Sequence, residues 1–470
     1  MFQFGRSQDS SGPTFKTFNP AQKNEGVGQY VAYEPNDIAE CLRRARSAQQ
    51  QWAALPVVER MAALTAWLNA LDVDSIARAI TLEQGKPSHE ARGETLKSIQ
   101  EAREMLAMAA QPLGQVHASS RVGVTPLSVR RPRGVIVAIT PWNFPMLSPM
   151  RKIAPALAYG NAILVKPSEL APAAACLVGE AAEGILPEGL LQVLPGDGVL
   201  GAALVASGVE GVTFTGSVPT GRAVYQAAAQ SLAEISLELG GKNAALVHDT
   251  KNLEQCLNQI ANAAFLCSGQ RCTAISRVIV QDSLAPAVVQ GLVDRAQALV
   301  PGSGLTEGVN FGPMVSAQHL KNVSTLVQNS LAAGARCRTG GQVLTEGHLA
   351  DGHFYAPTVL DNMTANNLAW QEEIFGPVIS VMTYQSLDEA FELLNNTEFG
   401  LTSALFSADI QVINRFIAQS QAGMLHINHG STPDSNMPFL GMKHSGVGAC
   451  SVGPGSAAFY TSEHAVYLGE

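Results

Sequence analysis

The stretch Gly134-Val135-Ile136-Val137-Ala138-Ile139 decides the fold class. The five residues after the glycine are all apolar, as expected of a short strand that is buried on both faces of a sheet. Similar apolar runs recur downstream at 162–165, 190–194 and 212–215, and helical segments separate them at 149–159, 172–183 and 219–228. Strands and helices that alternate at this spacing predict βαβ units and a parallel sheet, which binds ligands at the carboxyl ends of its strands.

A second alternating region begins after Gly240-Gly241. Strands are predicted at 244–247, 278–281, 356–360, 378–384, 404–407 and 424–428, and helices at 253–265, 285–300, 320–332, 387–395 and 410–419. Upstream of the first sheet, residues 1–34 are predicted to be extended, and most of the chain from there to residue 110 reads as amphipathic helix. The chain is therefore predicted to be an α/β protein with two sheets.

Two segments depart from this alternation, at 115–133 and 452–470. The first alternates like an exposed β ribbon, whose free edge another chain could cover. It is equally consistent with a plain surface hairpin. We expect the tail to pair with this ribbon, within one subunit or between two.

The composition excludes several classes of protein. A net charge of −9, with the basic residues of the 470-residue chain spread out, argues against a nucleic-acid partner. The seven cysteines are scattered without a CxxC pair, which argues against a disulfide framework and against a zinc site. No apolar signal core and no run of membrane-spanning length occurs. We therefore expect a reduced, soluble, cytoplasmic protein without a bound metal.

Two cysteines lie close together in the stretch Phe265-Leu266-Cys267-Ser268-Gly269-Gln270-Arg271-Cys272. A thiol beside a fixed cation loses its proton more easily, and the thiolate is the nucleophile. Arg271 therefore marks Cys272 as a candidate nucleophile. The alternative is that both thiols are ordinary buried side chains, since free cysteine is among the most buried residue types.

Polar residues follow several of the predicted strands. Asn143, between two prolines and two aromatic residues, offers a rigid amide donor of the kind that an oxyanion needs. Glu238 ends an apolar run, and such a setting raises a carboxyl pKa toward the range of a general base. Lys166 and Glu169 could hold ribose hydroxyls, and the segment 215–221 could place a phosphate at a helix N-terminus. Each signal alone also fits a structural or solvated residue.

Taken together and in order, seven motifs resemble the NAD(P)-dependent aldehyde dehydrogenase superfamily. They are PWNFP (141–145), KPSE (166–169), FTGS (214–217), ELGGK (238–242), GQRC (269–272), EEIFGP (372–377) and PFLGMKHSG (438–446). The resemblance covers nearly the whole chain. It implies a Rossmann-like cofactor domain (1–114 and 134–240), an α/β catalytic domain (241–444) and a small β bridging or oligomerisation element (115–133 and 445–470).

The resemblance implies a role for individual residues. Cys272 matches the nucleophile that forms a thiohemiacetal and then a thioester, Asn143 the oxyanion donor, and Glu238 the base for the hydrolytic water. The residues matched to cofactor binding are Trp142, Lys166, Ser168, Glu169, Gly216, Ser217, Leu239, Gly240, Glu373 and Phe375. Since the nucleophile maps to Cys272 alone, Cys267 is expected to pack rather than react.

The same resemblance implies the cofactor and the assembly. Glu169 would repel a 2′-phosphate, so NAD is expected, although some relatives with this residue also accept NADP. Glu238 favours hydrolysis to a free acid over transfer to coenzyme A, which is kept as an alternative. A non-enzymatic, crystallin-like use of the fold predicts loss of one of the three catalytic residues, and all are present. A homodimer or homotetramer is expected.

The substrate is expected to be a small aldehyde that carries an anionic group. Arg271 resembles the residue before the nucleophile in relatives that act on phosphorylated or phosphonate aldehydes, and Arg151 matches a carboxylate-binding arginine of succinic semialdehyde dehydrogenases. Leu266 stands where those enzymes have a second arginine, so the anion-binding set is incomplete. Oxidation of a neutral aliphatic or hydroxy-aldehyde is the alternative.

Overall fold

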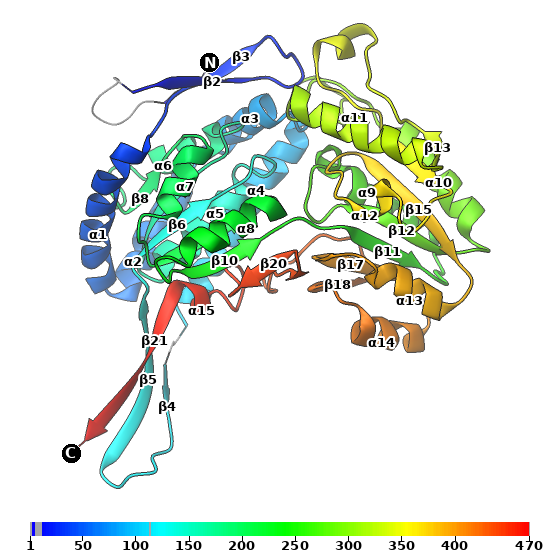
Figure 1. Cartoon of the computed structure of the whole chain (residues 1–470). Helices are drawn as coiled ribbons and strands as arrows, with labels where there is room; N and C mark the ends of the chain where they lie inside the picture. The colour runs from blue at the N-terminus through cyan, green and yellow to red at the C-terminus, as the bar shows by residue number, and fades with distance from the viewer. Residues whose placement is uncertain (1, 5–11, 112–113, 470) are drawn as a thin grey trace.

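The computed structural model describes residues 2–4, 12–111 and 114–469, and it is a mixed α/β structure with two large sheets side by side (Figure 1). Both sheets are parallel except for one antiparallel strand at an edge of each. Wholly apolar strands such as β6 (Val135–Ile139) have their first four residues buried, because helices cover both faces of a parallel sheet. The predicted fold class is confirmed.

The N-terminal part is a small three-stranded sheet followed by four helices. The sheet has the order β1-β3-β2, with β1 (Phe2–Phe4), β2 (Thr14–Phe18) and β3 (Gly26–Val31). The helices are α1 (Ile38–Ala54), α2 (Val57–Asn69), α3 (Val73–Gln84) and α4 (Ser88–Ala109), as the amphipathic pattern predicted. Trp52 and Trp67 anchor α1 and α2 in the core, each with its indole N–H donated to a backbone carbonyl.

The first large sheet has the strand order β20-β10-β9-β6-β7-β8. Its strands are β6, β7 (Ala162–Lys166), β8 (Leu191–Val193), β9 (Gly211–Thr215), β10 (Glu234–Glu238) and β20 (Gly446–Gly448). Its helices are α5 (Leu147–Ala158), α6 (Ala173–Glu180), α7 (Gly198–Val205) and α8 (Val218–Ala228). The chain runs outward from β6 to β8 and then returns to place β9 on the other side of β6. Such a reversal opens a ligand crevice at the carboxyl ends of the two strands.

Two elements of this sheet were not predicted. Helix α7 is apolar almost throughout and has no helical periodicity to reveal it. Strand β20 joins the sheet antiparallel to β10, with Gly446 opposite Glu238. Two of its three residues are glycine, so no strand pattern marks it.

The second large sheet has the order β13-β14-β15-β12-β11-β17-β18. Its strands are β11 (Asn243–Val247), β12 (Ile275–Gln281), β13 (Arg336–Thr339), β14 (Thr358–Asp361), β15 (Val378–Tyr384), β17 (Thr402–Phe406) and β18 (Met424–Ile427). Its longer helices are α9 (Leu253–Phe265), α10 (Ala285–Gln297), α11 (Ala317–Ala332), α13 (Leu387–Asn395) and α14 (Ile410–Gln419). A short helix, α12 (Leu368–Gln371), and a two-stranded pair of β16 (Phe399–Gly400) with β19 (Met442–Lys443) complete it. Four of these elements were not predicted, namely the antiparallel edge strand β13, the short helix α12 and the two-residue strands β16 and β19.

The third feature is an arm that projects from the body (Figure 1). It consists of β4 (Gly114–Val116), β5 (Val124–Pro132) and β21 (Thr461–Gly469), and β21 follows the short helix α15 (Ala457–Tyr460). Strand β21 pairs with β5 along nine residues, from Thr461 opposite Pro132 to Gly469 opposite Val124. The predicted pairing of the tail with the ribbon is confirmed, and it occurs within one chain.

Across the described residues, no helix is both long and apolar enough to cross a membrane. The largest apolar cluster joins α1–α5 to the first large sheet and includes Trp52, Trp67 and Phe459. Separate clusters fill the faces of the second sheet. The two sheets are therefore packed around their own cores, and β10 leads directly into β11 through Leu239–Lys242.

Candidate active site

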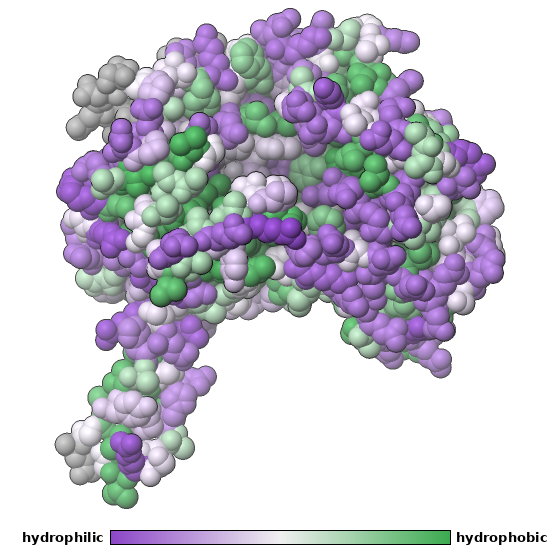
Figure 2. Space-filling view, viewed as in Figure 1, coloured by the Kyte–Doolittle hydropathy of each residue, from purple (hydrophilic) through white to green (hydrophobic). Residues whose placement is uncertain are grey.

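A cavity of about 620 Å³ lies where the two sheets meet. The turns after β6 and β9 line it, which are the turns that flank the reversal of strand order in the first sheet. The second sheet contributes residues that precede its strands, including Cys272 before β12 and Glu373 before β15. Figure 2 shows the surface hollowed between the two halves of the body. One cavity therefore collects most of the residues that the motifs singled out.

The nucleophile candidate follows an unusual turn. Cys267, Ser268 and Gly269 are consecutive residues with left-handed backbone, with φ of 55°, 53° and 70°. Side-chain bonds hold this turn: Ser268 Oγ donates to the Gly312 carbonyl (2.7 Å), and the Cys267 backbone N–H donates to Glu90 Oε2 (2.8 Å). Non-glycine residues in this region cost about 1–3 kcal/mol each and persist only where the surroundings enforce them.

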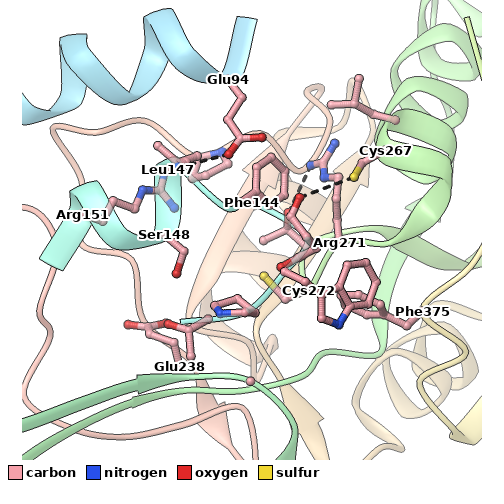
Figure 3. A pocket seen from close by; sticks show the side chains of 18 of the residues that line it. Glu94, Phe144, Leu147, Ser148, Arg151, Glu238, Cys267, Arg271, Cys272 and Phe375 are labelled. Carbon is pink, nitrogen blue, oxygen red and sulfur yellow. Dashed lines mark hydrogen bonds between the residues drawn. The ribbon is translucent and has the colours of Figure 1, made fainter. Parts of the chain in front are cut away.

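Beyond the turn, Cys272 is fixed from the second sheet. Asn243 Nδ2 donates to the carbonyl oxygens of Cys272 (2.7 Å) and Ala274 (2.9 Å). A side chain at Gly241 would collide with the Cys272 carbonyl, so glycine there permits the close approach. Figure 3 shows the Cys272 sulfur in the cavity between Glu238 and Phe375. The backbone of Cys272 is thus positioned before any substrate arrives.

The electrostatics of this thiol differ from the expectation. Burial, aided by the charges of Glu373 and Glu238, raises the pKa of Cys272 to about 12, against the lowering effect of Arg271 and Arg151. The predicted effect of the neighbouring cation therefore has the right sign, but the prediction of an easily ionised thiol is wrong because desolvation outweighs the cation. Burial also raises the pKa of Cys267, to about 11.

Asn143 lies on a turn that two buried ions hold in place. Its carbonyl accepts from Lys86 Nζ (2.9 Å), which also forms a salt bridge with Glu94 Oε2 (2.5 Å). The other oxygen of Glu94 accepts from the backbone N–H groups of Met146 (3.0 Å) and Leu147 (3.1 Å). The Asn143 amide uses one hydrogen on the Gln270 carbonyl (2.9 Å). An amide has two N–H donors, so a second remains for a ligand in the cavity.

Glu238 ends β10 inside the cavity. One of its carboxylate oxygens, Oε2, is buried and has no hydrogen-bond partner among the described residues. Burial raises the pKa of Glu238 to about 8, against the lowering effect of Lys152 and Arg151. Burial lowers the pKa of Lys152 in turn, and its Nζ donates to Thr213 Oγ1 (3.0 Å). The raised pKa expected for this carboxyl group is thus found.

The residues at one end of the cavity suit a nicotinamide ribose. Glu373 Oε1 accepts from the Gly241 backbone N–H (2.9 Å), and a side chain at Gly240 would collide with the Glu373 carboxylate. Gly216 and Ser217 line the cavity at the start of α8, whose N-terminal N–H groups suit an anion. The buried Glu373 carboxylate, a close-approach glycine and a helix N-terminus fit a dinucleotide at this strand crossing.

Aromatic side chains line the same end of the cavity. Trp142 and Phe375 meet edge to face, with ring centroids 5.4 Å apart, and His319 contacts both rings. His319 Nε2 donates to the Phe375 carbonyl (2.7 Å), and burial lowers the pKa of the imidazole. Leu239 also lines this end of the cavity. His319 was not predicted, because a single histidine in a helical pattern carries no signal of its own.

Three further residues matched to cofactor binding lie outside the cavity, at the end of β7 and just after it. They are Lys166, Ser168 and Glu169. Lys166 Nζ donates to the carbonyls of Pro167 (2.9 Å) and Gly196 (2.8 Å) and lies 3.5 Å from Glu169 Oε2. Burial lowers the pKa of Lys166. A lysine and a carboxylate therefore do lie together at this strand end.

The two arginines expected to hold a substrate anion both line the cavity, and both already donate to neighbouring side chains, although Nη1 of Arg271 is buried without a hydrogen-bond partner among the described residues. Arg151 is bound to Glu101 through two bonds, Nε–Oε2 (2.6 Å) and Nη2–Oε1 (2.9 Å). Arg271 is 5% exposed, and its Nη2 donates to Thr273 Oγ1 (3.1 Å). In Figure 3 the Arg271 side chain extends toward Cys267, away from Glu238.

One group of cavity residues was missed altogether. It comprises Lys86, Glu90, Glu94 and Lys97, at the start of α4 and just before it. Their spacing of three or four residues is only that of any amphipathic helix, which predicted the helix but not that one face would line a site. Glu101, the partner of Arg151, belongs to the same helix.

Comparison with known proteins gives one consistent result. Residues 7–466 match the model of the aldehyde dehydrogenase family. An α-ketoglutaric semialdehyde dehydrogenase of Bacillus subtilis is 34% identical over 98% of this chain and 96% of its own, and a betaine aldehyde dehydrogenase of Cereibacter sphaeroides is 36% identical over 98% and 95%. A crystal structure of betaine aldehyde dehydrogenase from Staphylococcus aureus in complex with NAD⁺ is 29% identical, with a TM-score of 0.94, over 97% of this chain and 91% of that one.

Proposed function

Because the chain belongs to the aldehyde dehydrogenase family and is an NAD(P)-dependent oxidoreductase, we propose that Cys272, Asn143 and Glu238 carry the oxidation of a small aldehyde to its acid. The single observation that supports this assignment is their position in one cavity, between an aromatic wall and a helix N-terminus suited to a dinucleotide. Cys272 lies in the turn before β12, Asn143 in the turn after β6, and Glu238 at the end of β10.

In the proposed reaction, the Cys272 thiol first releases its proton to solvent water, and the resulting thiolate attacks the aldehyde carbon and forms a thiohemiacetal. The free N–H of the Asn143 amide and the backbone N–H of Cys272 hold the developing oxyanion. NAD⁺, when bound, accepts the hydride. The acyl group then remains on Cys272 as a thioester, and Glu238 takes a proton from the water that cleaves it.

The proposed cofactor contacts divide into two sets. Trp142, Gly216, Ser217, Leu239, Gly240, Glu373 and Phe375 would surround the nicotinamide half, and Lys166, Ser168 and Glu169 the adenosine half. The carboxylate of Glu169 is 51% exposed and would repel a 2′-phosphate. We therefore expect a higher kcat/KM with NAD⁺ than with NADP⁺.

The proposed substrate is a small aldehyde with an anionic group. The two curated relatives named above act, by their names, on aldehydes of opposite charge, so the chemistry of the cavity has to decide. Transfer of the acyl group to coenzyme A is not favoured.

We further propose that the first sheet with residues 1–114 and 134–240 forms the cofactor domain, and that residues 241–444 form the catalytic domain. Residues 115–133 and 445–470 would form the bridging element of a homodimer or homotetramer. The cytoplasm is the proposed location, since the seven cysteines are all free thiols.

Initial rates of NADH formation without coenzyme A test the activity. The aldehydes are succinic semialdehyde, butanal, lactaldehyde and betaine aldehyde, and the product acid is identified by mass spectrometry. Turnover to the free acid supports the proposal. No turnover of any aldehyde, or turnover only after coenzyme A is added, would overturn the hydrolytic role of Glu238.

A further inference from the structure

One face of α4 forms the outer wall of the cavity. Glu90, Gly93, Glu94 and Lys97 all line it, at the spacing of three and four residues that places side chains on one face of a helix. Across the mouth lie Thr432 and Pro433, which also line the cavity. A substrate that enters from solvent therefore passes between this helix face and the 432–433 segment.

The mouth is open beside this face because residue 93 is a glycine. A Cβ atom built at Gly93 would meet no atom within 4 Å, so no neighbouring protein atom requires glycine there. Glycine in the interior of a helix is destabilising relative to alanine. Its effect at this position is to leave space one turn before Lys97.

Two of the cations deeper in the cavity form salt bridges with carboxylates. Lys86 is 2% exposed and forms a salt bridge with Glu94, and Arg151 is bound to Glu101 through two bonds. Two others, Arg271 and Lys152, are buried. Burial lowers the pKa of each, and the charges of Glu90 near Arg271 and Glu238 near Lys152 oppose this shift.

Lys97 is the exception among these cations. Its side chain is 36% exposed, and its ion-pair contact is with Glu101 at 3.6 Å. That carboxylate already accepts both hydrogen bonds of Arg151. Lys97 Nζ donates to the Pro433 carbonyl (3.2 Å), a neutral acceptor. One carboxylate faces two cations, so the mouth carries one surplus positive charge, and it is on a flexible side chain.

We infer that Lys97 makes the enzyme prefer anionic substrates, by binding the anionic group at the far end of an aldehyde whose carbonyl is at Cys272. The inference rests on the proposed function and names a different residue from the two arginines that the sequence suggested. An entering carboxylate would replace the Pro433 carbonyl as the acceptor for Lys97 Nζ, and Gly93 leaves room for it. Lys97 acts on specificity and takes no part in bond making.

The experiment compares two aldehydes that differ at one end only. Succinic semialdehyde and butanal have four carbons each, and the first carries a carboxylate where the second has a methyl group. The variants are Lys97→Met and Lys97→Glu, with Arg103→Met as the matched control. Arg103 is an exposed cation of the same helix that donates to Asn69 and does not line the cavity.

For Lys97→Met we expect KM for succinic semialdehyde to rise about 3- to 10-fold with kcat nearly unchanged, as befits a partly exposed charge. KM for butanal should stay constant. Lys97→Glu should give a larger rise for the anion and a lower KM for betaine aldehyde. Added salt should weaken the preference for the anion in the wild type and have little effect in Lys97→Met.

Equal changes for both aldehydes, or no change for either, would overturn the role of Lys97 while butanal turnover keeps the proposed activity intact. A selective loss in Arg271→Leu with none in Lys97→Met would return the role to Arg271. If the wild type oxidises neither aldehyde, the proposed function itself fails, and the two failures are thereby distinguished.

Discussion

Burial shifts the pKa values of the ionisable residues in the cavity. The pKa values of Cys272 and Glu238 both lie above their ordinary ranges because each group is desolvated, and the charges of Glu373 and Glu238 add to the rise at Cys272. Arg271 and Arg151 oppose this shift for the thiol without reversing it. The reactivity of Cys272 is therefore controlled by the carboxylates around it as much as by the adjacent guanidinium.

Substitutions of the two neighbouring cysteines should have clearly different effects on activity. Cys272→Ala should abolish NADH formation, because the proposed nucleophile is lost. Cys267→Ala should keep activity within a few-fold, since that thiol is 1% exposed and contacts only the Asn143 carbonyl at 3.7 Å. Steady-state rates and the number of thiols that iodoacetamide modifies measure both. Loss of activity in both variants would show that Cys267 shares the chemistry.

Glu238 gives the reaction a pH dependence of predictable sign. Its raised pKa of about 8 means that the carboxyl group is largely protonated at pH 6 and gains its base form as the pH rises. Where thioester hydrolysis limits turnover, kcat should rise with pH through this range and level off above it.

Glu238→Gln keeps the shape and removes the base. We expect one equivalent of NADH to form rapidly, followed by turnover about 10²–10⁴-fold slower than in the wild type. Stopped-flow absorbance would record the burst. A slow first turnover, without a burst, would mean that Glu238 is needed before the thioester forms.

Among single residues, the sequence predicted which side chains line the cavity better than it predicted their partners. Cys272, Asn143 and Glu238 are recognisable because each lies in a short local motif, and those of Asn143 and Glu238 follow apolar runs. The pairing of Arg151 with Glu101 joins residues 50 positions apart on two helices, and helical periodicity says nothing of which faces meet. The free cation of the mouth could not be identified until that partner was known.

Among the elements, the start of α5 depends on α4. Glu94 accepts from two N–H groups near the N-terminus of α5, and Lys86 bridges this carboxylate to the Asn143 carbonyl. The turn that carries Asn143 is thus held by a buried ion pair between Glu94, on α4, and Lys86, just before that helix. The boundaries of both helices were predictable from periodicity, whereas this connection between them was not.

Breaking that ion pair should be costly. Lys86→Met leaves the Glu94 carboxylate buried without its cation and should lower the free energy of unfolding by about 3–5 kcal/mol. Lys86→Met/Glu94→Gln should recover part of the loss because no charge remains unpaired. Urea unfolding measures both.

An exposed ion pair between α3 and α4 provides the comparison. Arg92 lies 3.1 Å from Asp74, with both side chains more than half exposed, and Arg92→Met should change stability by less than about 1 kcal/mol. Equal destabilisation by Arg92→Met and Lys86→Met would contradict the argument that burial makes the Lys86–Glu94 pair costly to break.

For the whole molecule, the body and the arm differ in what they leave exposed. On the arm, Val116 is 73% exposed, Val122 is fully exposed and Tyr467 is 71% exposed (Figure 2). Isolated exposed apolar residues are ordinary, but several on one projecting arm favour the proposed oligomer, in which a partner would cover them. The sequence predicted the ribbon and its pairing, but only the structure shows how far it stands from the body.

The proposed oligomer can be tested with one pair of valines. Val116→Asp on the arm should have a lower mass than the wild-type assembly, because the substitution would bury a charge at the interface. Val58→Asp is the control, since Val58 is 74% exposed on α2, which is not part of the arm. Size-exclusion chromatography with light scattering gives the mass of each. A monomeric wild type, or dissociation by Val58→Asp alone, would contradict the proposal.

The pairing of β20 with β10 has a consequence for how the chain folds while the ribosome synthesises it. The edge of β10 is closed only by residues 446–448, about 210 residues after β10 itself has been made. At about 5–20 residues per second, translation leaves that edge uncovered for about 10–40 s. Its exposed backbone groups can pair with any other extended segment during this time. Cells that produce this chain therefore need chaperones that shield the nascent first half, and slowing translation between the two strands should lower the soluble yield.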